Sequence, residues 1–154
     1  MELNPLTALS PIDGRYARQT DALRDIFSEC AFMNARVRVE VEWLISLSEA
    51  GFAELPHLSD HGKAFLRGLA DNFSLADCEA IKEIEKTTNH DVKAVEYWIK
   101  NQVAHDEELK SASEFVHFSC TSEDINNTSH AIMLKRGREA LADYLQQIHD
   151  TIAG

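Results

Sequence analysis

The end of the sequence carries one helical pattern that runs from Ser122 to the C-terminus and constrains the fold more than any other feature. Its later apolar residues recur at three- and four-residue steps, at Leu141, Leu145, Ile148 and Ile152. A helix of this length depends on packing of its apolar face, and the chain supplies no obvious partner for it. We therefore expect a piece of a larger helical protein. The alternative is an intact helical protein whose last helix closes its own bundle or dimerises.

The rest of the sequence also has helical periodicity and no convincing strand, so the predicted fold class is all-α. A long helix is expected from Asp21 to a stop near Gly51. Within it, valines 37, 39 and 41 alternate with charged residues, a strand-like period. A helix is still favoured because no turn residue interrupts it and because Arg36–Glu40 and Arg38–Glu42 are i,i+4 pairs.

Local signals divide the remainder of the chain. Pro5, Pro11 and Gly14 oppose helix formation, so we expect an extended arm over the first twenty residues. Caps at Ser59 and Ser74 predict two further helices, and a fourth buries an apolar stripe over 92–103. An acidic linker at 106–108 and a short turn from Ser113 follow.

Composition excludes several classes of function. The net charge of -11 and the pI near 5.0 argue against a nucleic-acid or membrane-surface binder, which needs a basic surface. We find no signal peptide and no membrane-spanning run, so a cytoplasmic protein is expected. The three cysteines, Cys30, Cys78 and Cys120, are odd in number and far apart, so they are expected to be reduced thiols of a cytosolic protein. His117 and Cys120 lack a second ligand pair, so no metal site is predicted.

The first cluster that could carry chemistry is a Pro-Ile-Asp-Gly turn within residues 10–16 that presents Arg15 and Tyr16 together. A guanidinium offers a planar fork suited to phosphate, and a tyrosine adds a hydroxyl donor or a stacking face. The alternative is an ordinary surface turn in which Arg15 pairs with Asp13 or Glu2.

The second cluster, over 87–93, places His90 at or beside a helix N-terminus, where Asn89 or Asp91 can serve as the cap. Unpaired backbone N–H groups at such a terminus favour anions. His90 could therefore donate a hydrogen bond to a phosphate or assist proton transfer. The alternative is a capping turn with no ligand.

The third cluster precedes the long last helix. Thr121 and Asp124 have capping-box spacing, and the Thr121 and Ser122 hydroxyls at a helix N-terminus could bind a carboxylate or phosphate. The alternative is simply a well-capped helix. His117 lies in an apolar run, where a histidine is usually part of the core.

Together, three segments resemble the adenylosuccinate lyase family of many proteobacteria, in the fumarase/aspartase superfamily. They read Ser-Pro-Ile-Asp-Gly-Arg-Tyr (10–16), Thr-Thr-Asn-His-Asp-Val-Lys-Ala-Val-Glu-Tyr (87–97) and Glu-Phe-Val-His-Phe-Ser-Cys-Thr-Ser-Glu-Asp-Ile-Asn-Asn (114–127). The resemblance implies the family's N-terminal helical domain over 1–110 and the start of its central helical bundle, with the first helix of that bundle, over 111–154. It also implies β-elimination of fumarate from adenylosuccinate to give AMP, and from SAICAR to give AICAR, in purine biosynthesis. It implies no cofactor or metal, and a homotetramer whose subunits share each active site.

The resemblance also implies roles for individual residues toward a succinylated purine nucleotide. Arg15 and Tyr16 would hold the phosphate, Asn89, His90 and Asp91 would line the nucleotide side, Thr121 and Ser122 would hold a succinyl carboxylate, and His117 would lie nearby. The family's Thr-His-Gly-Gln segment with its acid histidine, and its Ser-Ser-x-Met-Pro-x-Lys loop with its base serine, are absent from these residues. The chain alone is therefore expected to be inactive. Competing hypotheses are a non-catalytic helical interaction module that binds through 141–152, and a related lyase acting on a different succinylated substrate.

Overall fold

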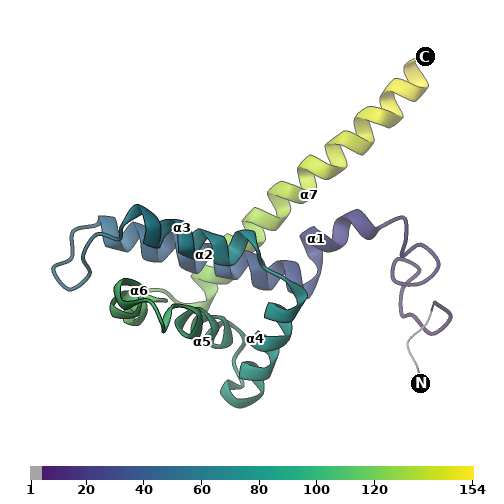
Figure 1. The fold of residues 1–154 in the computed structure, drawn as a ribbon. Helices are drawn as coiled ribbons and strands as arrows, with labels where there is room; N and C mark the ends of the chain where they lie inside the picture. The colour runs from purple at the N-terminus through teal and green to yellow at the C-terminus, as the bar shows by residue number, and fades with distance from the viewer. Residues whose placement is uncertain (1–4) are drawn as a thin grey trace.

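The computed structural model describes residues 5–154, and every regular element in that part of the chain is a helix, which confirms the all-α prediction (Figure 1). In chain order the elements are η1 (Asp21–Leu23), α1 (Arg24–Phe27), α2 (Glu29–Glu49), α3 (Asp60–Asp71), α4 (Leu75–Thr88), α5 (Asp91–Val103), α6 (Glu107–Ala112), η2 (Ser113–Phe115) and α7 (Ser122–Ala153).

Helix α2 is the centre of the fold and packs against α3, α4, α5 and α7. Its fully buried aliphatic side chains meet those of the surrounding helices in one core (Val37, Val41, Leu44, Leu66, Ile81, Val95, Ile99 and Leu109). The helical interpretation of the valine run is thus confirmed, since two of its valines face this core. Burying such side chains contributes about 1.5–3 kcal/mol each, so α2 is held mainly by packing.

The predicted ion pairs within α2 are wrong. None of the four side chains pairs one turn along the helix, because α2 is surrounded by other helices whose charged groups lie closer. The observed pairs are Arg38–Asp71, Arg67–Glu42, Arg36–Asp91 and Glu40–His117.

Two boundaries near the N-terminus also differ from expectation. The helix predicted from Asp21 is interrupted at Ser28, whose extended backbone (ψ 163°) lets its Oγ accept the Ala31 N–H at 3.2 Å and cap α2. Residues 5–20 are not extended but wind through turns, with the Gly14 N–H donating to the Ser10 carbonyl at 3.0 Å. Gly51, with φ 83°, follows the end of α2 as predicted.

The predicted caps of the middle helices are confirmed. The Ser59 Oγ accepts the Gly62 N–H at 3.0 Å at the start of α3, and the Ser74 N–H donates to Asp77 Oδ2 at 2.8 Å at the start of α4. The acidic linker is instead a helix start, because Asp106 Oδ1 accepts the Leu109 N–H at 2.9 Å and caps α6. The short turn from Ser113 is η2.

Cys30 and Cys78 form a disulfide that joins the first turn of α2 to α4, with Cα atoms 5.7 Å apart. The expectation of reduced thiols is therefore wrong for this pair, because the packing of α4 on α2 brings together two residues 48 apart in sequence. Cys120 is free, and burial raises the pKa of its thiol.

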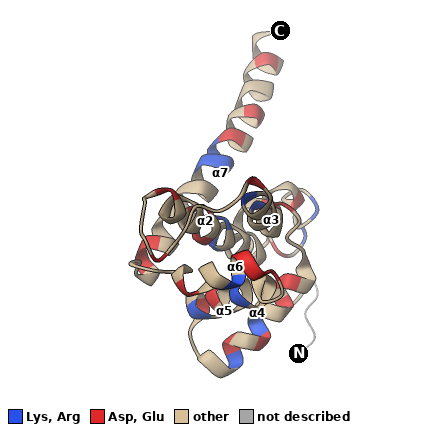
Figure 2. Ribbon diagram, turned by 60° about the vertical axis from the view of Figure 1, so that its left-hand side comes forward, with Lys and Arg blue, Asp and Glu red and all other residues tan. Residues whose placement is uncertain are grey.

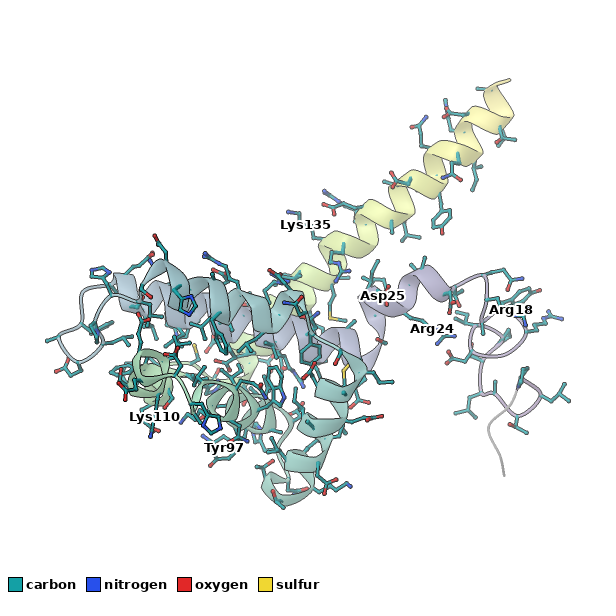
Figure 3. All side chains as sticks on the ribbon, viewed as in Figure 1. Arg18, Arg24, Asp25, Tyr97, Lys110 and Lys135 are labelled. Atoms are coloured by element: carbon teal, nitrogen blue, oxygen red, sulfur yellow. A yellow bond between two sulfur atoms is a disulfide. The ribbon has the colours of Figure 1, made fainter. Side chains whose placement is uncertain are left out.

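The second half of α7 extends away from the other helices (Figure 1), and beyond the labelled Lys135 its side chains project into open space (Figure 3). The buried residues of α7 all lie in its first half, at Ile125, Ser129, Met133 and Gly137. The row from Leu141 to Ile152 is between 52% and 80% exposed, which confirms that the described residues supply no partner for it. Acidic residues continue along this free part (Figure 2). No helix among residues 5–154 is both long enough and apolar enough to cross a membrane.

Candidate functional site

The start of α5 and the start of α7 lie side by side, so two of the three predicted clusters meet. The contact that joins them is between His90 Nε2 and Ser122 Oγ, which are 3.4 Å apart. Each helix presents unpaired backbone N–H groups at this end, and both partial dipoles favour a negative charge there. A surface cavity of about 490 Å³ opens beside this junction and is lined by Phe32, Arg36, Asn89, His90, Asp91, Glu29 and Glu85.

His90 itself is the N-cap of α5. Its Nδ1 accepts the Lys93 N–H at 3.2 Å, so a neutral imidazole carries its proton on Nε2 and donates it toward Ser122 Oγ. The prediction that Asn89 or Asp91 caps α5 is wrong. Asn89 instead ends α4 in the left-handed conformation (φ 49°), which asparagine tolerates better than most residues. This turn fixes the direction of the His90 ring.

The predicted capping box at the start of α7 is confirmed. Asp124 Oδ2 accepts both the Thr121 N–H and the Thr121 hydroxyl at 2.8 Å, and the Asp124 N–H donates to Thr121 Oγ1 at 3.4 Å. The Thr121 hydrogen bonds, the backbone one foremost, lower the pKa of Asp124. The Thr121 hydroxyl is thus engaged in the cap, while the Ser122 hydroxyl has, within the described residues, only its long contact with His90. Ser122 is the more available of the two for a ligand.

The Arg36 side chain of α2 forms hydrogen bonds with the start of α5 and with the first turns of α7. Its Nη2 donates to Asp91 Oδ2 at 2.5 Å and its Nε to Asn126 Oδ1 at 2.9 Å. The guanidinium lies over the Phe32 ring at 3.9 Å, and only 6% of the Arg36 side chain is exposed. The pKa of Asp91 is lowered. Burial is the largest single influence and raises this pKa, but the hydrogen bond from the Val92 N–H and the charge of Arg36 together outweigh burial.

Glu40, one turn further along α2, contacts His117, whose Nδ1 lies 2.5 Å from Glu40 Oε1. Glu40 is 0% exposed, and its second carboxylate oxygen is buried without a hydrogen-bond partner among residues 5–154. Burial is the main cause that raises the pKa of Glu40, and the bond to His117 opposes it. His117 has φ 64°, so its backbone is also in the left-handed region. His117 lies beside the third cluster for a structural reason, because the buried Glu40 carboxylate holds its imidazole.

Arg15 and Tyr16 do not join the site. They lie in the N-terminal arm, where the Arg15 guanidinium stacks over the Tyr16 ring at 4.7 Å. In Figure 1 this arm lies beyond α1, on the side away from the start of α5. Asp13 pairs with Arg24 at 3.7 Å, and Glu2, the other partner considered for Arg15, lies outside the described residues. Within residues 5–154, the structure thus joins residues 89–91 to 121–122 through the contact between His90 and Ser122, and it leaves Arg15 and Tyr16 apart from them.

Sequence reasoning missed the residues of α2 that support the site, Arg36 and Glu40. The available signal was their position: both fall among the apolar residues that face the core of the long helix, where a charge needs a partner. Asn126 was missed as well, and it lies one turn after Ser122 on the same side of α7.

Comparisons with known proteins agree on one family. Residues 14–154 match a family model described as Lyase. The adenylosuccinate lyase of Vibrio cholerae is 56% identical over 142 residues, which cover 92% of this chain and 31% of that protein. The adenylosuccinate lyase of Haemophilus influenzae is 53% identical and that of Escherichia coli K12 is 51% identical, each over 99% of this chain and 34% of the relative. The chain therefore spans about a third of the length of the curated relatives it matches.

Proposed function

Because the chain belongs to the lyase family whose model matches residues 14–154, we propose that it is the N-terminal part of an adenylosuccinate lyase. The complete enzyme would release fumarate from adenylosuccinate to give AMP, and from SAICAR to give AICAR, in purine biosynthesis. It would act in the cytoplasm, without a metal or organic cofactor and without binding nucleic acid. Residues 1–110 would form its first domain and residues 111–154 the start of its helical bundle.

The reaction is an elimination in which a base removes a proton β to the leaving nitrogen and an acid protonates that nitrogen. Negative charge develops on the adjoining carboxylate, so donors that bind this carboxylate lower the barrier. The acid histidine and the base serine would come from the remaining part of the protein. This chain would supply binding groups only.

The observation that carries the proposal is the meeting of His90 with Ser122 at the start of two helices, 3.4 Å apart. The Ser122 hydroxyl and the first N–H groups of α7 would bind a succinyl carboxylate, assisted by Thr121. Asn89, His90 and Asp91 would line the nucleotide side of the site. His90 Nε2–H would donate to the substrate in place of Ser122, and His117 would hold the preceding turn.

Arg15 and Tyr16 would bind the nucleotide phosphate only after assembly. Their position on the arm, apart from α5 and α7, fits a site completed by another subunit. The exposed apolar row from Leu141 to Ile152 fits the same arrangement, because a homotetramer built on a helical bundle would cover it.

The competing interaction-module hypothesis gives no reason for His90 and Ser122 to meet, since an adaptor would bind through 141–152 alone. The meeting of two predicted clusters at one point therefore favours the lyase. A related lyase with another succinylated substrate would lack a use for a phosphate-binding Arg15.

The test compares the 154-residue chain with a complete polypeptide that continues it, by following fumarate release from adenylosuccinate. We expect release by the complete protein and none by the chain alone. In the complete protein, Ser122→Ala should lower kcat/KM by about a hundredfold, the cost of losing one oxyanion donor, and Arg15→Ala should mainly raise KM. Ser111→Ala, an exposed serine on α6, is the control. Turnover by the chain alone, or wild-type kinetics in Ser122→Ala, would refute the proposal.

A further inference from the structure

We propose that Arg36 is a positioning residue of the site, which ties the start of α5 to the start of α7 and thereby sets the separation of His90 and Ser122. The inference deepens the proposed function and rests on it for the meaning of the site. The tie itself is a property of the chain and can be measured without any substrate.

The two hydrogen-bond partners of Arg36 lie close to the site residues, one on α5 and one on α7. Asp91 is the residue after His90, and Asn126 is four residues after Ser122, so Ser122 and Asn126 lie on one face of α7. Nη2 and Nε belong to a single planar guanidinium, whose donors point in fixed directions. Bonds of 2.5 Å to Asp91 and 2.9 Å to Asn126 therefore fix the distance and the angle between the two helix starts.

Aromatic rings from α2 and α7 also hold the plane of the Arg36 guanidinium. Phe32 lies one turn before Arg36 on α2, and its ring stacks under the guanidinium at 3.9 Å. The other neighbour of this ring is His130, one turn after Asn126 on α7, with ring centroids 4.5 Å apart. The column His130–Phe32–Arg36 thus joins α2 to α7 beside the hydrogen bonds, so the guanidinium has little freedom to rotate.

Arg36 also changes the charge next to the anion site. Asp91 has a side chain that is 49% exposed and adjoins His90 at a point where an anionic substrate is proposed to bind. An unpaired carboxylate there would repel the substrate, on a chain whose net charge is already -11. The Arg36 cation compensates Asp91 from the buried side. The two effects can be separated, because a lysine at this position keeps the charge but cannot present two divergent donors from one rigid plane, so the geometric effect alone predicts that Arg36→Lys fails.

The first experiment uses the isotopically labelled 154-residue chain and NMR. Arg36→Lys should change the NMR chemical shifts of two backbone amides, that of Lys93, which donates to His90, and that of Ser122. Arg38→Lys is the matched control, because Arg38 lies on the same helix and pairs with Asp71 at the surface. Unchanged chemical shifts of these two amides in Arg36→Lys would refute the proposed link between the two helix starts, whatever the activity of the complete protein.

The second experiment measures fumarate release by the complete protein. A wild-type protein without this activity refutes the proposed function and leaves the first experiment to decide on Arg36. Given activity, folded Arg36→Lys should lose at least about tenfold in kcat with KM changed by less than about threefold, because misplaced groups lower the rate more than ground-state binding. A residue that only stabilises the fold would leave kcat of the folded protein unchanged, and that result would overturn the proposal. Should Arg36→Lys fail to fold, Asn126→Ala removes one bond and is held to the same criteria.

Discussion

Replacing His117 by asparagine should destabilise the chain by about 3–5 kcal/mol at pH 7, because Glu40 would remain buried without a partner. Glu40 is 0% exposed, and His117 Nδ1, at 2.5 Å, is the hydrogen-bond partner of its Oε1. The other carboxylate oxygen of Glu40 already lacks a hydrogen-bond partner in the part of the chain that the structure describes. Asparagine is the informative replacement because it tolerates the left-handed backbone at φ 64°, but its side chain is too short to replace the imidazole. The measured loss then reports the carboxylate and not the backbone.

The double variant Glu40→Gln/His117→Asn separates charge from packing. With no buried charge left, the remaining cost should fall to about 1–2 kcal/mol, the cost of one unmade hydrogen bond. The two single changes should therefore be strongly non-additive, as expected for residues in direct contact.

The loss should also depend on pH. Burial raises the pKa of Glu40, so the folded chain binds a proton at pH values where the unfolded chain does not. The stability that depends on this proton is present below the ordinary carboxyl pKa and is lost as the pH rises through the raised value. Without His117, which opposes the rise, the pKa of Glu40 should increase further. The His117→Asn penalty should accordingly be smaller at pH 5 than at pH 7.

Urea unfolding followed by circular dichroism at both pH values measures these free energies. His105→Asn, at an exposed turn after α5, is the matched control and should stay within about 0.5 kcal/mol of the wild type. A His117→Asn loss below about 1 kcal/mol at pH 7, or a double variant no more stable than the single one, would refute the buried-pair reasoning.

Three further predictions concern other contacts. Reduction of the Cys30–Cys78 disulfide should lower the unfolding free energy by about 4 kcal/mol, because the bond closes a loop between residues 48 apart in sequence; urea titration with and without reductant measures the change. Gly137→Ala should destabilise by about 1 kcal/mol despite its better helix propensity, because a Cβ there would overlap the Phe27 ring; adding Phe27→Leu should reverse the loss in thermal melts. Asp124→Asn should weaken the cap above the ordinary carboxyl pKa but have little effect in acid, since its pKa is lowered and its stabilisation is lost as the pH falls; melting temperatures at pH 7 and pH 3 test the sign.

Features encoded by neighbouring residues could be predicted from the sequence. The helical period placed the helices, and the caps at Ser59, Ser74 and Thr121 follow from a hydroxyl and a backbone N–H two or three residues apart. The start of α5 was harder, since asparagine and aspartate are usual caps and histidine is not. Here Asn89 is used for its tolerance of positive φ at the end of α4, so the next residue, His90, becomes the cap. A single local preference could not decide between these two uses of one asparagine.

Features that depend on which helices meet could not be predicted. Arg36 and Glu40 have the spacing of a surface ion pair, and only the positions of α5 and α7 show that each binds a different helix start or turn. Cys30 and Cys78 were assigned as thiols from their number and spacing, whereas the packing of α4 on α2 joins them. Both errors have the same physical origin. Periodicity gives the face of a helix a residue occupies, but not the element that covers that face.

Three residues on one face of α2 explain why the site can be ordered although the second half of α7 has no partner within residues 5–154. Phe32, Arg36 and Glu40 follow one another at four-residue steps and form a stripe on one face of α2. Each of the three contacts a different part of the site: the His130 ring, the two helix starts and the His117 turn. All of these contacts lie before residue 131, within the part of the chain where α7 is packed on α2. The geometry of His90 and Ser122 is therefore fixed within the N-terminal region, independently of the exposed apolar row that begins at Leu141.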